Sequence, residues 1–346
     1  MSLAIEIMNP IDYPGWDELL LSTKDYSFFH SSAWSRVLCE SYNYKPLYFT
    51  IIDQNKLLLL IPLMEVRSLL TGRRGVSLPF SDICEPIISQ DTPFEDAIKY
   101  IIEYGKGSKW NYIEFRGGNG FSNSVSSSSY FYEHTLNLKK NENQMLSLFR
   151  DTTKRNIQKA VSAGIEVKIC NSLESIKGYY RLHCITRKRH GLPPQPFYFF
   201  RKVFENVIAK DSGLIILAFY KKKNIAGAVY FHLGEKALFK YGASDKNYQN
   251  LRPNNLVMWE AIKWYAQQGF KEFSFGRTEP ENEGLRQFKS GWGTEERPVK
   301  YYRYDIAQDV YLNNCQKEST FYNRLFKKMP VSMLRIFGSL LYKHMA

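Results

Sequence analysis

The chain has 346 residues, which is enough for two domains that each bury a core. Apolar residues make up 44% and charged residues 23%, which is typical of a globular protein and excludes a disordered or fibrous chain. Lys and Arg outnumber Asp and Glu by 47 to 34, and the net charge of +13 favours an anionic partner, whether nucleic acid, phosphate or an acidic membrane surface.

The cysteines and the N-terminus indicate a cytoplasmic protein. The five cysteines are odd in number and show no CxxC spacing, which favours reduced thiols over a disulfide frame or a zinc site. The first residues, MSLAIEIMNP, lack the basic and apolar regions of a signal peptide. Since no run of about 18 apolar residues occurs, we expect no membrane-spanning helix.

The first half of the chain alternates helical and strand patterns. In order, the periodicity and turn residues predict a helix at 32–42, a hairpin of strands at 47–53 and 56–67, a helix at 94–104, a strand at 112–116, a glycine- and serine-rich loop at 117–129 and a strand at 130–138.

The second half predicts the same order of elements. We expect a long helix at 141–163, helices at 173–188 and 198–210, a meander at 214–220, 225–233 and 237–241, a helix at 255–268, a strand ending at Gly276, a short helix at 284–290 and a strand at 299–304. Because each half runs helix, hairpin, helix, strand, the sequence predicts an α/β (α+β) protein with domains at 1–138 and 139–305.

The stretch from Ser274 to Tyr304 is the strongest candidate for a functional site. Two predicted strands flank a charge-rich loop and a short helix that carries Lys289. Such loops often fix polar groups at the mouth of a cleft, although a solvated surface hairpin would have the same composition.

Several segments resemble the Fem-type (FemABX) aminoacyltransferases of the GNAT-like acyltransferase superfamily. The resemblance extends from about Phe29 to Tyr304 and marks the superfamily better than the substrate. The segments are FHSSAWSRVL (29–38), LPFSDICEP (78–86), TTKRNIQKAVSAGIEV (152–167), YYRLHCITRKRHGLPPQPFYFF (179–200) and EGLRQFKSGWGTEERPVKYY (283–302).

The resemblance implies two tandem GNAT-like domains, each a mixed sheet flanked by helices, with the C-terminal segment 306–346 returning to the first domain. It implies transfer of an amino acid from aminoacyl-tRNA to the peptide of a nucleotide- or lipid-linked muropeptide, without a metal. The longer family members insert a coiled-coil arm, and no such heptad stretch is present here.

The resemblance also implies roles for particular residues. Lys289, with Phe288 beside it, would stabilise the oxyanion of acyl transfer. Arg36 would hold a substrate phosphate, and either Arg187 or Arg189 would hold a second one, since guanidinium groups grip phosphate with two hydrogen bonds. In each case the alternative is a solvated cation.

Three further residues are candidates from their positions. Asp82, in a loop after a strand, would accept a hydrogen bond from the attacking amine or hold an ammonium group, unless it makes a turn. Tyr241 and Tyr301 lie near strand ends and would bond peptide or sugar, unless they only pack.

The donor is expected to be aminoacyl-tRNA, with no other cofactor. Acetyl-CoA-dependent GNAT enzymes hold the pyrophosphate on a glycine-containing loop at a helix start. The corresponding segment here, QNLRPNN (249–255), has no glycine, and its proline has no N–H to donate. An acyl-CoA donor is the alternative.

The segment 319–346 contains five Lys or Arg residues and no acids, with apolar residues at helical spacing. It would either lie on an anionic membrane, with the protein peripheral at the inner face, or pack on the first domain.

The sequence thus predicts a cytoplasmic acyltransferase that forms an amide on a cell-envelope precursor, most simply a peptidoglycan aminoacyltransferase of the cell wall. The alternatives are an acyl-CoA-dependent N-acyltransferase of exopolysaccharide or small-metabolite biosynthesis, and a non-catalytic, basic RNA- or membrane-binding protein. The sequence does not specify an oligomeric state.

Overall fold

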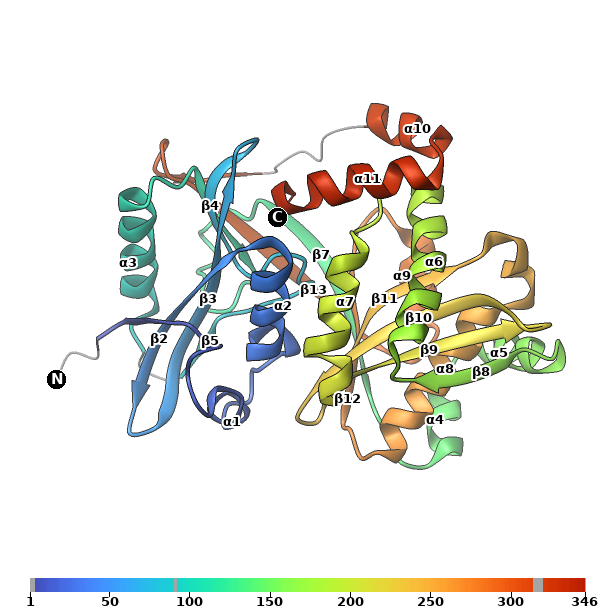
Figure 1. Cartoon of the computed structure of the whole chain (residues 1–346). Helices are drawn as coiled ribbons and strands as arrows, with labels where there is room; N and C mark the ends of the chain where they lie inside the picture. The colour runs from blue at the N-terminus through green and yellow to red at the C-terminus, as the bar shows by residue number, and fades with distance from the viewer. Residues whose placement is uncertain (1–3, 90–91, 314–319, 346) are drawn as a thin grey trace. The chain divides into compact units, whose positions relative to one another are not determined.

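The computed structural model describes residues 4–89, 92–313 and 320–345, and its contacts divide the chain into two units. Unit 1 comprises Met1–Phe131, Pro298–Lys317 and Lys343–Ala346, and unit 2 comprises Tyr132–Arg297 and Glu318–Tyr342. Each unit has a mixed sheet with helices packed on it, so the expected α/β fold is present (Figure 1).

The sheet of unit 1 has the strand order β1-β2-β3-β4-β6-β13, with β5 beside β3 and β14 beside β13. Its pairs are antiparallel except for β4 and β6, which are parallel. The strands are β1 (Glu6–Met8), β2 (Lys45–Asp53), β3 (Lys56–Ser68), β4 (Gly72–Val76), β5 (Ile87–Ile88), β6 (Tyr112–Arg116), β13 (Glu295–Asp305) and β14 (Val310–Tyr311), and the helices are α1 (Trp16–Leu21), η1 (Phe28–His30), α2 (Ser32–Tyr42) and α3 (Phe94–Gly107).

Alternation along β2 gives unit 1 a packed layer on each face of its sheet. Phe49 packs in a core with Ile98 and Ile101 of α3. Its neighbour Tyr48 points the other way, where the Ser35 hydroxyl of α2 donates a 2.9 Å hydrogen bond to the Tyr48 hydroxyl oxygen. This is the period-2 pattern expected of a strand covered by helices on both sides.

The sheet of unit 2 has the strand order β7-β12-β11-β10-β9-β8. The strands are β7 (Ser129–Asn137), β8 (Glu166–Cys170), β9 (Gly213–Tyr220), β10 (Lys223–Leu233), β11 (Lys236–Ser244) and β12 (Glu272–Thr278). The helices are α4 (Glu142–Leu148), α5 (Asp151–Ser162), α6 (Leu173–His190), α7 (Phe197–Asn206), η2 (Ile208–Lys210), η3 (Lys246–Leu251), α8 (Pro253–Gln267), α9 (Glu283–Ser290), α10 (Thr320–Lys328), α11 (Val331–Leu341) and η4 (Tyr342–His344).

The helices of unit 2 cover both faces of its sheet. Tyr230 of β10 is buried in a core with Leu256 and Ile262 of α8. On the other face, Gly227 of β10 approaches the ring of Tyr179 on α6, and Figure 1 shows α6 crossing in front of β9 to β11. Residues of β10 therefore pack against two separate layers of helices.

The units differ from the domains predicted at 1–138 and 139–305. The chain passes between units inside β7 and inside β13, and most of the C-terminal segment lies in unit 2 instead of joining the first domain. The reason is that α10 and α11 pack against α6 of unit 2, whereas the residues up to Lys317 and those from Lys343 onward belong to unit 1.

One predicted helix is interrupted in the structure. The helix expected at 141–163 is two helices, because the chain turns at Phe149 and Arg150. There the Arg150 N–H donates a hydrogen bond to the Gly291 carbonyl, and the Phe149 ring packs against Trp259 and Trp292. A tertiary contact here overrides the helical pattern. The sequence patterns do not predict the strands β1, β4, β5, β8 and β14.

Candidate functional site

The geometry of unit 2 is set by two parallel strands that separate. β11 and β12 pair only from Lys236 to Leu238 on β11, yet β11 continues to Ser244 and β12 to Thr278. A pocket of about 390 Å³ lies beside the far end of β11. Residues from β10, β11, α6, α8 and α9 line it, so elements on both faces of the sheet contribute to the pocket. Its volume falls in the range of small-molecule sites.

Arg189 is the charged residue that distinguishes this pocket. It lies on the pocket wall, and its Nη1 atom is buried with no hydrogen-bond partner among the described residues. A buried guanidinium N–H without an acceptor is costly, so an anionic ligand would satisfy it. Phe288 and Leu285 of α9 form an apolar wall of the same pocket.

Arg187 has a different position from Arg189. Its Nε donates to the Pro193 carbonyl at 3.2 Å, and its Nη2 donates to the Tyr342 hydroxyl at 2.8 Å. These bonds tie α6 to the loop that follows it and to the end of α11. Of the two arginines that the sequence left open, only Arg189 lines the pocket.

Lys289 sits behind the apolar wall and is only 2% exposed. Its Nζ donates hydrogen bonds to the carbonyls of Gly276 at 2.8 Å and Arg277 at 3.0 Å. Gly276 has a φ of +67°, which lets β12 bend there, and the register of β12 against β7 shifts between Ser274 and Arg277. The ammonium group therefore clamps α9 to the bent end of β12.

A histidine and a carboxylate lie near this clamp. His134 of β7 is fully buried, and its Nε2 lies 2.9 Å from Oε2 of Glu296. Burial, and then the positive charge of Lys289, lower the pKa of His134 to about 4. Hydrogen bonding to Arg286 lowers the pKa of Glu296. The imidazole is therefore neutral at pH 7, while the carboxylate beside it is charged.

Sequence reasoning missed His134, although a signal was present. His134 and Leu136 alternate along β7, and both are buried. A histidine on the buried face of a strand deserves consideration as a titratable group in the core.

Tyr241 is not among the pocket-lining residues. Its ring packs with those of His183, Phe199, Phe200 and Phe231, an aromatic cluster formed by α6, α7 and β10. The sequence left open whether Tyr241 bonds a substrate or packs, and the structure shows its ring packed in this cluster.

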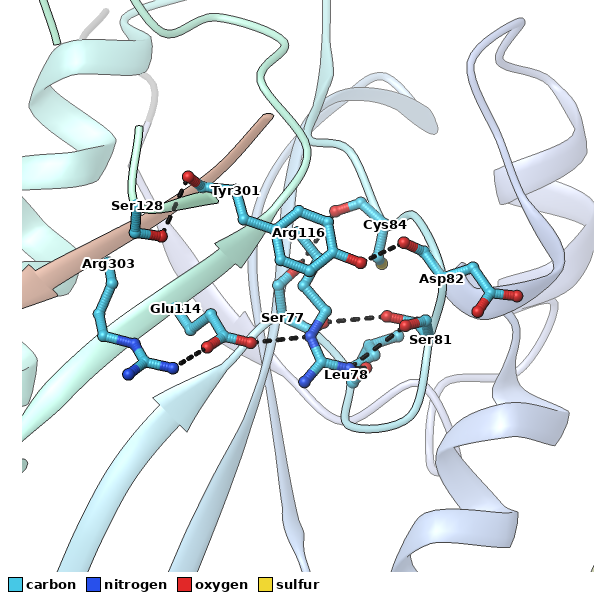
Figure 2. A network of polar contacts seen from close by, with 10 residues as sticks. All are labelled: Ser77, Leu78, Ser81, Asp82, Cys84, Glu114, Arg116, Ser128, Tyr301 and Arg303. Carbon is cyan, nitrogen blue, oxygen red and sulfur yellow. Dashed lines mark hydrogen bonds and ion pairs between the residues drawn. The ribbon is translucent and has the colours of Figure 1, made fainter. Parts of the chain in front are cut away.

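In unit 1, Asp82 lies in a loop held at several points, shown in Figure 2. The Ser77 hydroxyl donates to the Cys84 carbonyl at 3.0 Å, and Arg116 donates to the carbonyls of Leu78 and Ser81. The Tyr301 hydroxyl donates to the Asp82 carbonyl. These bonds fix the backbone that carries Asp82, and Tyr301 of β13 contributes one of them.

The same network contains a buried carboxylate, Glu114, bonded to Arg116 and Arg303 (Figure 2). Burial opposes its ionisation, but the charges of the two arginines outweigh burial and lower the pKa of Glu114 to about 2. Arg116 therefore links a charged centre to the Asp82 loop. Arg36, expected to hold phosphate, is exposed on α2 of this unit.

The segment compared above with the CoA loop forms η3 and the start of α8. Arg252 has a φ of +61°, and Pro253 is the first residue of the helix. The helix start at this end of the pocket thus lacks one of the N–H groups that would cradle a pyrophosphate.

Within the described part of the chain, no group of three or more His, Cys, Asp or Glu residues could hold a metal ion. A search of the same residues finds no helix that is both long and apolar enough to cross a bilayer. The cysteines that are described, Cys39, Cys84, Cys170 and Cys184, are unpaired, and Cys315 lies outside the described residues.

Comparison with known proteins identifies the fold. Residues 147–290 match the acetyltransferase (GNAT) domain. The crystal structure of FemX superposes with a TM-score of 0.66 at 13% identity over 88% of this chain and 98% of that one. A tandem GNAT protein from the clavulanic acid biosynthesis pathway gives 0.58 at 8% identity, over 88% and 98% of the two chains. The fold is therefore that of the tandem GNAT-like proteins.

Part of the chain is also similar in sequence to curated proteins. The chain is 30% identical over 120 residues to the lipid II:glycine glycyltransferase of Staphylococcus haemolyticus, covering 32% of this chain and 28% of that protein. The chain thus spans less than a third of the length of the curated relatives it matches. Part of the chain is therefore similar to lipid II:glycine glycyltransferases, and residues 147–290 are similar to a GNAT domain.

Proposed function

We propose that this protein is an aminoacyltransferase that joins an amino acid to the peptide of a peptidoglycan precursor. The observation that carries the proposal is the pocket beside the diverging strands of the GNAT domain, with the partnerless Nη1 of Arg189 on its wall. The similarity to lipid II:glycine glycyltransferases supports a lipid-linked precursor as the acceptor.

The reaction needs no cofactor in this proposal. The acceptor amine attacks the ester carbonyl of an aminoacyl-tRNA, a C–N bond forms and the C–O bond to the ribose breaks. The ribose oxygen leaves as a hydroxyl with the proton that the amine loses. Arg189 would hold a phosphate of the donor, and Arg36 a phosphate of the acceptor. Such contacts position the two reactants, which can supply much of the rate acceleration.

Lys289 would act in this reaction through the wall that it supports. Its two carbonyl bonds fix α9, and α9 presents Phe288 and Leu285 to the pocket. Its direct role at the oxyanion, and the role of Asp82 toward the amine, stay predictions. The protein would work in the cytoplasm against precursors at the inner face of the membrane.

Transfer assays with purified protein test the proposal. The acceptors are lipid II and its nucleotide-linked precursor, and the donors are charged tRNAs or acetyl-CoA. We expect amide formation from an aminoacyl-tRNA. Clear thermal stabilisation by acetyl-CoA, together with acetyl transfer, would favour the acyl-CoA alternative instead.

A further inference from the structure

An exposed apolar surface of unit 2 lies on the helices α10 and α11. In α11, Leu334 and Gly338 are buried, and Tyr342 follows on the same side of the helix. A β carbon at position 338 would collide with the Pro194 carbonyl, so this side lies directly against the chain after α6. The spacing of four residues defines the packed face of the helix.

The opposite side of α11 carries a second apolar stripe that remains exposed. Its residues follow the i, i+3, i+4, i+7 spacing of one helical face. They are Met333 (44% exposed), Ile336 (61%), Phe337 (37%) and Leu340 (59%). In a surface helix such a stripe normally packs against the core, whereas in α11 the other side of the helix packs against the core.

The exposed stripe continues onto α10, and the segment that carries it is basic. Leu325 of α10 is 52% exposed, and the rings of Phe326 and Phe337 lie 6.1 Å apart. From 319 to the C-terminus the sequence has five cations and no acid: Arg324, Lys327, Lys328, Arg335 and Lys343. On α6, where both helices pack, no acid follows Glu174.

We propose that this face, the basic apolar face of α10 and α11, docks the protein on an anionic lipid bilayer. Apolar side chains would enter the boundary between headgroups and acyl chains, and the flanking cations would pair with anionic headgroups. Contact is peripheral, in line with the absence of a spanning helix among the described residues. The inference is independent of the proposed function, but it would bring the protein to any lipid-linked acceptor.

Charge decides between a bilayer and a second copy of the chain as the occupant. Two copies meeting through this face about a two-fold axis would bring both sets of cations together without any acid from the segment. An anionic bilayer offers the complementary charge instead. A membrane surface therefore suits both the apolar stripe and its surroundings.

Vesicle sedimentation with the full chain tests the proposal. The vesicles contain phosphatidylcholine alone or with about one third phosphatidylglycerol. We expect binding to the anionic vesicles, weakened by salt. Lys327→Gln with Lys328→Gln should weaken binding about 25-fold, since each cation contributes about fivefold.

The apolar stripe is tested by Ile336→Ser with Leu340→Ser, which should lower binding at least tenfold. The matched control is Val161→Ser on α5, an equally exposed apolar residue (51%) outside the proposed face, which should bind as the wild type does. All variants should keep the thermal midpoint, and the stripe variant should keep its transfer rate on a water-soluble, nucleotide-linked acceptor.

Three results would overturn the proposal. The first is no binding of the wild type to anionic vesicles at low salt. The second is equal binding by the wild type and the stripe variant. The third is a dimer in sedimentation velocity that the stripe variant abolishes while vesicles bind neither protein. A failure of vesicle binding with transfer activity intact would leave the proposed function standing.

Discussion

Replacing Lys289 by methionine tests whether its ammonium group clamps the wall of the pocket. Methionine has a similar length and fills the same buried space, but it cannot donate to the carbonyls of Gly276 and Arg277. The variant therefore removes two charge-assisted hydrogen bonds between α9 and β12 and leaves the apolar contacts in place.

The expected loss of stability follows from opposing terms. Each hydrogen bond to a charged group contributes about 1.5–3 kcal/mol, while removal of a buried charge also relieves its desolvation penalty. We expect a net loss of about 2–4 kcal/mol. For a domain of this size, 1 kcal/mol shifts the melting midpoint by about 2–4 °C, so the midpoint of unit 2 should fall by roughly 5–15 °C.

Thermal unfolding of Lys289→Met measures this loss, with Lys159→Met as the control because Lys159 is exposed on α5. The pKa of His134 should also rise in the Lys289 variant, because the charge of Lys289 helps to lower it. NMR titration of the imidazole detects that change. Melting midpoints of wild type and Lys289→Met within about 1 °C would refute the clamp. A kcat loss of about a hundredfold in the folded variant would support the predicted oxyanion role.

Three further predictions concern the arginines and the buried titratable groups. Arg187→Ala should lower the melting midpoint because it breaks the hydrogen bonds to Pro193 and Tyr342. Arg189→Ala should raise KM for the donor with little change in the melting midpoint. The reverse pattern would contradict the assignment of Arg187 to structure and Arg189 to the pocket. Glu114→Gln should destabilise unit 1 by about 3–5 kcal/mol in denaturant unfolding, because it removes the buried negative charge that Arg116 and Arg303 pair with. The His134 pKa of about 4 lies below its ordinary value of 6.5, so the unfolded state binds the proton first on acidification. Stability of unit 2 should then fall by up to about 3 kcal/mol between pH 6.5 and 4, and a flat midpoint over that window would contradict a buried neutral imidazole.

Local patterns predicted most of the elements but not their tertiary adjustments. The helix at 32–42 and the strand at 112–116 have the predicted limits, because turn residues and apolar periodicity bound them clearly. The break between α4 and α5 could not be predicted, since it depends on a hydrogen bond from Arg150 to Gly291. That contact joins residues far apart in the sequence.

The candidate site shows the same limit. Sequence comparison singled out the arginines at 187–189, yet two residues apart on a helix point to different sides, and only the fold shows that Arg189 faces the pocket. For Lys289 the sequence predicted a group directed at a transition state. Its bonds to two backbone carbonyls depend on the bend at Gly276, which no local pattern specifies.

Transfer of a labelled amino acid from tRNA to lipid II by wild type and Arg189→Ala tests the central claim most directly. The account predicts labelled lipid II with the wild type and a loss of at least tenfold in kcat/KM with the variant, since a charged contact of about 1.4 kcal/mol or more corresponds to that factor. The comparison variant is Arg36→Ala, which should weaken binding of the acceptor and leave binding of the donor unchanged. Equal rates for wild type and Arg189→Ala, or product from acetyl-CoA with none from any charged tRNA, would contradict the account.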